Sequence, residues 1–153
     1  MDKWDIRFVK MARLISEWSS CYNEGRNIGA VIVKDKRIMT TGYNGAPAGI
    51  KTCKERGECL RRKLNIPSGT RAEVCYAIHA EQNAILQGAK LGISIDGATL
   101  YCTHQPCSVC AKMIVNVGIK RVVYEQGYPD PFALEFFQEA GVLLERFEMA
   151  QED

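Results

Sequence analysis

The sequence predicts an α/β domain built on a mixed sheet. After residue 78, patterns typical of helices and of strands alternate three times, which indicates helices layered on a sheet with parallel strand pairs. Before residue 45, a hairpin pattern adds an antiparallel pair, so the sheet is mixed. A length of 153 residues with 46% hydrophobic residues suits one core, and we expect residues 1–153 to form a single domain.

The first part of the chain predicts a helix followed by the hairpin. Large apolar residues recur at helical spacing over residues 4–19, which predicts an amphipathic helix. Residues 28–33 and 37–42 have the pattern of two strands, and Asp35 and Lys36 form the turn between them.

A long loop follows the hairpin and extends to residue 75. Its residues 45–72 are rich in glycine, proline and charge, and we predict irregular structure there. Loops of this length in a small domain are usually functional or held by a metal ion.

The remaining elements alternate along the chain. Each predicted helix is followed by a predicted strand, which is the pattern of parallel strands joined by helical crossovers. The helices are residues 79–91, 107–117 and 131–140, and the strands are residues 98–103, 120–125 and 142–147.

Composition narrows the function classes. The formal net charge of +2 is too small for the strongly basic surface that nucleic-acid binding requires. We find neither an apolar stretch of the roughly 20 residues that span a bilayer nor a signal peptide, and we expect a cytoplasmic protein. Seven cysteines, an odd number, then favour metal binding or thiol chemistry over disulfides.

Two motifs can meet at one point. His79 and Glu81 lie at the start of one predicted helix, and Cys107 and Cys110 lie at the start of the next, after a proline that favours a helix start. Residues 79–91 make a helix of roughly 20 Å. The following strand returns roughly the same distance, so the two helix starts come together.

These residue types indicate a catalytic zinc site. One imidazole and two thiolates give zinc three protein ligands, and a catalytic site keeps its fourth position open. Bound water then becomes a nucleophile near neutral pH, and the Glu81 carboxylate can move its protons. A Cys-x-x-Cys pair alone also suits a thioredoxin-like redox centre, but His79 and Glu81 disfavour that reading. His104 is interpreted as a satisfied polar residue that lies beside the site.

The chain resembles the deoxycytidylate (dCMP) deaminases of the zinc-dependent cytidine deaminase superfamily. The resemblance lies in "HAEQNAI", "PCSVCAKMIVNVGIKRVVY" and "IGAVIVKDKRIMTTGYNGAPAG", and it covers most of residues 20–145. The H-x-E and P-C-x-x-C spacing is the signature of zinc-dependent nucleobase deaminases. The resemblance implies a three-layer α/β/α sandwich around a mixed five-stranded sheet.

The resemblance also implies an activity and its residues. Hydrolysis of dCMP would give ammonia and the dUMP that thymidylate synthesis uses, with His79, Cys107 and Cys110 as zinc ligands and Glu81 as proton shuttle. Asn44 matches the family asparagine that contacts the substrate sugar, although Asn-Gly is also a common turn dipeptide. We expect further substrate contacts from Arg26 and Ala80.

The substrate phosphate needs cationic or backbone donors. Basic residues crowd the long loop and the segment before the first strand, and most of them belong to a solvated face. They are Arg26, Lys51, Lys54, Arg56, Arg61, Arg62, Lys63 and Arg71.

Four cysteines, Cys21, Cys53, Cys59 and Cys75, have two readings. Some family members hold a second, structural zinc at positions that resemble Cys21 and Cys53, and such a site would hold the long loop. Alternatively, the four are small apolar residues. Helices 79–91 and 107–117 are apolar over much of their circumference, which, with the family habit, suggests a homo-oligomer such as a dimer or hexamer.

Other functions remain open. One alternative is deamination of another base or nucleotide, such as dCTP, cytidine or tRNA adenosine. A second alternative is a zinc-stabilised binding module without catalysis, in which Glu81 would have no role.

Overall fold

A computed structural model describes residues 1–127 and 130–148, and it confirms the predicted α/β fold with a mixed five-stranded sheet. The strand order is β2-β1-β3-β4-β5. β1 pairs antiparallel with β2 and β3, whereas β3–β4 and β4–β5 are parallel pairs. The strands are β1 (Gly29–Lys34), β2 (Arg37–Tyr43), β3 (Thr99–His104), β4 (Arg121–Gln126) and β5 (Leu143–Arg146).

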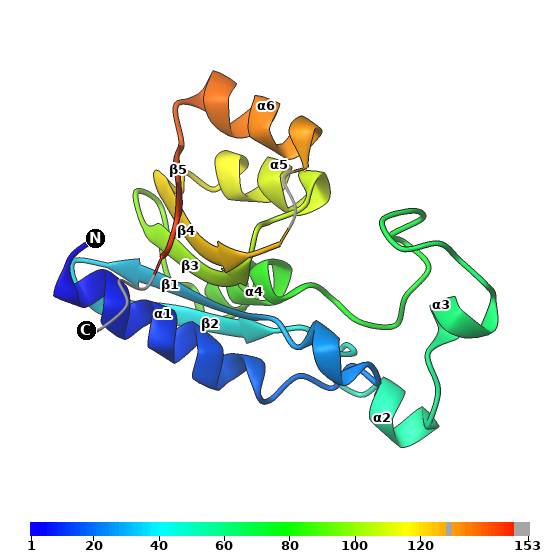
Figure 1. The fold of residues 1–153 in the computed structure, drawn as a ribbon. Coiled ribbons are helices and arrows are strands. Elements are labelled where there is room, and N and C mark those ends of the chain that lie inside the picture. Colours follow the sequence, from blue (N-terminus) through cyan, green and yellow to red (C-terminus); the bar gives the residue numbers. More distant parts are fainter. Residues whose placement is uncertain (128–129, 149–153) are drawn as a thin grey trace, which may run out of the picture.

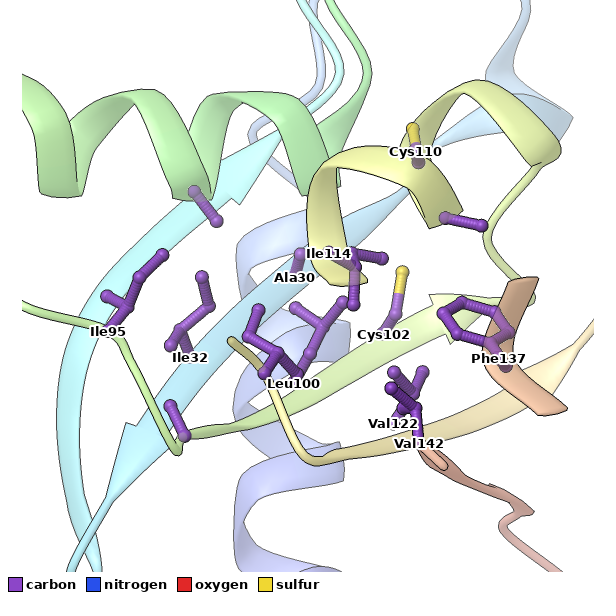
Figure 2. Packing of buried hydrophobic residues seen from close by; sticks show 14 of the residues in the cluster. Ala30, Ile32, Ile95, Leu100, Cys102, Cys110, Ile114, Val122, Phe137 and Val142 are labelled. Atoms are coloured by element: carbon purple, nitrogen blue, oxygen red, sulfur yellow. The ribbon is translucent and has the colours of Figure 1, made fainter. Parts of the chain in front are cut away.

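Helices cover both faces of the sheet, which gives three layers (Figure 1). Apart from short helices in the loops, they are α1 (Lys3–Ser16), α4 (Ala80–Leu91), α5 (Ser108–Asn116) and α6 (Pro131–Ala140). α1 packs on one face against Val31 and Tyr101, and the other three helices cover the opposite face. Successive side chains of β1 point to opposite faces of the sheet. Val31 therefore packs under α1, whereas Ala30 and Ile32 belong to the core under α4, α5 and α6 (Figure 2).

Element boundaries differ slightly from those predicted. The first helix ends at Ser16 instead of residue 19, and the third long helix begins at Ser108, with Cys107 as its N-cap. The hairpin turn is as predicted: Asp35 and Lys36 have φ angles of 52° and 60°, the left-handed pair that fits a two-residue hairpin turn.

The long loop is more ordered than predicted. It contains two four-residue helices, α2 (Cys53–Arg56) and α3 (Leu60–Lys63), and a 3-10 turn, η1 (Glu24–Arg26), precedes β1. Thr52 caps α2 by accepting a hydrogen bond from the Glu55 N–H at 3.1 Å. Figure 1 shows this segment extending away from the sheet.

A buried ionic cluster joins α1 to the sheet. The Arg121 guanidinium donates to both Asp5 oxygens at 2.7 and 3.1 Å, and the Tyr101 hydroxyl donates to the same carboxylate at 2.7 Å. Burial raises the pKa of Asp5, but the hydrogen bonds from Arg121 and Tyr101 outweigh this effect and lower the pKa to about 2. The carboxylate is therefore charged in the folded protein.

We predict that Asp5→Asn lowers the free energy of unfolding at pH 7 by about 2 kcal/mol. A lowered folded-state pKa gives stability that is present above pH 4 and lost as pH falls through about 2. The difference between wild type and variant, measured by urea denaturation, should therefore shrink towards pH 2. Asp35→Asn, in the exposed turn, is the control and should change stability by about 0.5 kcal/mol or less. Equal stabilities of wild type and Asp5→Asn at pH 7 would contradict the prediction.

Candidate metal centre and active site

The starts of α4 and α5 meet at one point, as their spacing predicts. His79 is the N-cap of α4 and Cys107 is the N-cap of α5, so both helices begin at candidate metal ligands. The Gln82 side chain accepts a hydrogen bond from the His79 N–H at 2.9 Å, which stabilises this helix start. Cys110 lies within α5, and it is fully buried.

The three ligand atoms fit a tetrahedral zinc ion. One ligand atom from each of His79, Cys107 and Cys110 lies within 4.8 Å of the others. His79 Nδ1 is 3.3 Å from the Cys110 sulfur and 3.6 Å from the Cys107 sulfur. Zn–N and Zn–S bonds of about 2.0 and 2.3 Å at a tetrahedral angle would put nitrogen and sulfur roughly 3.6 Å apart. The donor set is that of a catalytic zinc site with one open position.

The electrostatics of the three ligands are tightly linked. A hydrogen bond from Cys110 lowers the pKa of Cys107 to about 4, and the same contact, together with burial, raises the pKa of Cys110. The contact with Cys107 raises the pKa of His79. The close contact of the two sulfurs thus favours negative charge on one of them, and a divalent cation would favour the thiolate form of both.

Glu81 lies against these ligands from the first turn of α4. Its side chain is buried, at 4% exposure, and its Oε1 accepts a hydrogen bond from the Cys102 sulfur at 3.1 Å. The Cys110 thiol also contacts this carboxylate. A carboxylate beside a metal site with an open position has the placement of a general acid and base.

Glycine at one position allows α4 to lie this close to the sheet. A Cβ atom on Gly42 of β2 would lie 2.2 Å from the Ala80 carbonyl oxygen and 2.5 Å from the Ala84 nitrogen. The backbone of α4 therefore packs directly on β2, which fixes the height of His79 and Glu81 above the sheet.

A cavity of about 930 Å³ opens beside the candidate metal site. Its wall includes His79 and Cys107, together with the predicted substrate residues Asn44 and Arg26 and the neighbouring His104. Burial lowers the pKa of His104, which favours the neutral imidazole. The structure thus brings most of the predicted site residues to one cavity.

Asn44 has a structural task that the sequence alone did not reveal. Its Oδ1 accepts from the Ile28 N–H at 2.9 Å, and its Nδ2 donates to the Arg26 carbonyl at 2.7 Å. One amide hydrogen and one oxygen lone pair remain for another partner. Ala80 differs, because its side chain is fully buried and is absent from the cavity wall.

The basic residues divide into two groups. Arg26, Arg61 and Arg62 line the cavity, joined by Arg146, which the sequence analysis did not single out. The Arg61 guanidinium donates to main-chain carbonyls of the loop, so it holds the cavity wall. Its acceptors are the carbonyls of Pro67, Thr70, Arg71 and Val74. The other predicted candidates lie outside the cavity wall: Lys51, Lys54, Arg56, Lys63 and Arg71.

Four of the remaining cysteines, Cys21, Cys53, Cys59 and Cys75, lie in one neighbourhood. All seven cysteines, each within the described residues, are free thiols. Burial raises the pKa of Cys53, and the nearby thiols of Cys75, Cys21 and Cys59 raise it further. In the part of the chain that the structure describes, His79, Cys107 and Cys110 form the group whose three ligand atoms lie within 4.8 Å of one another. The thiols of Cys21, Cys53, Cys59 and Cys75 do not form such a group there.

Asp130 connects the starts of two helices, and sequence reasoning missed it. Its Oδ1 caps α6 through the Phe132 and Ala133 N–H groups, and its Oδ2 accepts from the Ser108 N–H at 2.9 Å. One carboxylate thereby ties α6 to the first turn of α5, next to Cys107. The Asp-Pro pair signals the cap of α6 but not the second contact.

Residues 2–126 match the family model described as the cytidine and deoxycytidylate deaminase zinc-binding region. ComE operon protein 2 of Bacillus subtilis is 40% identical over 147 residues, which are 95% of this chain and 72% of that protein. The deoxycytidylate deaminase of Schizosaccharomyces pombe is 37% identical over 94% of this chain, but the chain spans only 44% of that protein.

A solved structure has the same fold. The dCMP deaminase of cyanophage S-TIM5, in complex with dCMP and dUMP, aligns with a TM-score of 0.76 and 35% identity. The alignment covers 96% of this chain and 99% of the cyanophage chain. None of the helices in the described ranges has the length and apolar character that crossing a membrane requires.

We predict that His79→Ala lowers the zinc content by one equivalent per chain, because two thiolates alone hold zinc weakly. His104→Ala is the matched control, since this histidine lines the same cavity but lies outside the ligand set, and it should keep the wild-type zinc content. Elemental analysis of the purified proteins gives the answer. Equal zinc in wild type and His79→Ala would exclude this ligand set.

Proposed function

Because this chain belongs to the cytidine and deoxycytidylate deaminase family, we propose that it hydrolyses dCMP to dUMP and ammonia. The observation that carries the proposal is the buried Glu81 carboxylate beside the three-ligand site of His79, Cys107 and Cys110. A purely structural metal site has no need of a buried carboxylate at this place. Relatives named deoxycytidylate deaminase support the choice of dCMP over other nucleotides.

Zinc and Glu81 would have separate roles in the proposed reaction. When bound, zinc supplies the Lewis acidity that makes water a usable nucleophile near neutral pH. Glu81 accepts a proton from the water that adds to the ring carbon bearing the amino group, and it passes this proton to the adjacent ring nitrogen. Glu81 then transfers the second water proton to the amino group, which leaves as ammonia. One water is consumed, and no oxidant or reductant is required.

The residues of the cavity wall support a nucleotide as the proposed substrate. The remaining amide hydrogen and lone pair of Asn44 are our proposed sugar contact, and Ala80 would contribute only its backbone because its side chain is buried. Arg26 is exposed on the cavity wall, where its Nη2 donates to the Ser68 hydroxyl at 3.1 Å. Arg61 is committed to loop carbonyls, and Arg62 and Arg146 are the other basic residues of the wall. We assign the phosphate contact to Arg26 because it adjoins the proposed sugar contact: the Asn44 Nδ2 donates to the Arg26 carbonyl.

The second zinc remains part of the proposal. The thiols of Cys21, Cys59 and Cys75 lie near enough to Cys53 to raise its pKa, and four thiolates are the ligand set of a structural zinc site. Elemental analysis should then find two zinc ions per wild-type chain and one in Cys53→Ala. A content of one in both proteins would remove this second site.

A homo-oligomer and a cytoplasmic location complete the proposal. Partly exposed apolar side chains on α4 and α5 support assembly of a dimer or hexamer, which light scattering tests: Leu86, Leu91, Val109 and Met113. The seven free thiols suit a reducing compartment such as the cytoplasm.

We predict that the zinc-loaded protein consumes dCMP faster than deoxycytidine, cytidine or dCTP. The rate of each reaction is measured as loss of ultraviolet absorbance. Glu81→Gln should keep its zinc but lower kcat by about 10²-fold to 10⁴-fold, because it removes the proton carrier. Preference for another substrate would indicate a different deaminase. Binding of dCMP without turnover in the wild type would indicate a binding module.

We also predict that Arg26→Gln raises KM for dCMP about tenfold and leaves KM for deoxycytidine unchanged, because only dCMP carries the phosphate. Lys63→Gln is the matched control, since Lys63 pairs with Glu58 at 3.3 Å and lies outside the cavity wall. Steady-state kinetics with both substrates test this. A parallel rise of both KM values would argue against a phosphate contact.

A further inference from the structure

Cys102 lies directly beneath the carboxylate of Glu81. It is 1% exposed, at the centre of the sheet, where β3 pairs it with Ala30 of β1 and Tyr124 of β4. Figure 2 shows its sulfur on the face of the sheet that α5 covers. The sulfur is 3.1 Å from Glu81 Oε1, which is hydrogen-bond distance for a thiol.

The direction of this hydrogen bond follows from burial. Burial and the neighbouring Glu81 charge both raise the pKa of Cys102 well above that of a free thiol. The sulfur therefore keeps its proton, and an S–H group facing a carboxylate donates. The strand holds the donor in place, because Cys102 is paired with neighbouring strands on both sides.

The acceptor needs such a partner. A glutamate side chain has three rotatable bonds, and only some of its orientations bring an oxygen to the water beside the ligands. On the ligand side, the Glu81 carboxylate contacts Cys110, and on the sheet side it contacts Cys102. The carboxylate thus lies between Cys110, which belongs to the candidate ligand set, and Cys102, which does not.

We propose that Cys102 is a positioning residue, whose S–H group holds the Glu81 carboxylate in the orientation from which it exchanges protons with water and substrate. This inference rests on the proposed deaminase function. The competing explanation is that Cys102 only fills space, since it also belongs to the apolar core with Leu100 and Ile114.

Three variants separate positioning from packing. Cys102→Val keeps an apolar side chain of similar size and removes the donor, whereas Cys102→Ser keeps a donor and weakens the apolar packing. Leu100→Val is the matched control, because it removes a methylene from the same strand and the same core without touching Glu81. Each zinc-loaded protein is assayed for zinc content, thermal midpoint, and kcat and KM for dCMP.

If Cys102 positions Glu81, the variants that lose thermal stability are not the variant that loses kcat. Cys102→Val should lower kcat about tenfold with KM within about twofold of wild type, because a lost hydrogen bond to a charged group acts on the proton-transfer step. Cys102→Ser should keep kcat within about threefold of wild type although its thermal midpoint falls. Leu100→Val should lose thermal stability and keep kcat, and all variants should hold wild-type zinc.

Two results would overturn the inference. In one, Cys102→Val retains the wild-type kcat; in the other, kcat follows the thermal midpoint across all three variants. Failure of the proposed function looks different, because the wild type itself would then leave dCMP unchanged. If the wild type deaminates another base, the same comparison is made with that substrate, and if it deaminates none, the inference falls with the proposed function.

Discussion

The site depends on one geometric constraint: the N-terminal ends of α4 and α5 must lie within a few ångströms of each other. Both helices start at a candidate ligand, His79 in one case and Cys107 in the other. Several independent contacts fix these two ends. The backbone of α4 rests on Gly42 of β2, and the carboxylate of Asp130 holds the first turn of α5. A helix N-terminus also favours negative charge, which suits thiolate ligands and a carboxylate.

Much of the fold, and the meeting of the three candidate metal ligands, could be predicted from the sequence, because both leave local patterns. Alternating helix and strand patterns after residue 78 predicted the layered sheet, and the Asp35-Lys36 turn predicted the hairpin. The ligands followed from the spacing of His79, Cys107 and Cys110 and from a simple length argument about a helix and a returning strand. Here, short-range sequence information was sufficient because the relevant residues sit at the ends of regular elements.

The rest could not be predicted, because it depends on side chains that meet only after folding. Nothing in the sequence near Cys102 indicates that its sulfur lies against Glu81, 21 positions earlier in the chain. Asp130 likewise contacts the Ser108 N–H group, 22 positions earlier in the chain, and nothing near Asp130 in the sequence indicates this second contact. The long loop has little helical or strand periodicity, so its two short helices and the role of Arg61 were not visible in advance.

The way in which Arg61 secures the loop has a consequence for evolution. Its guanidinium contacts main-chain carbonyl oxygens alone in that segment, and every amino acid carries such an oxygen. Side chains between Pro67 and Val74 can therefore be exchanged without releasing the tether. Since Ser68 and Thr70 border the cavity, neutral drift in this short stretch offers a route to altered substrate preference on an unchanged scaffold.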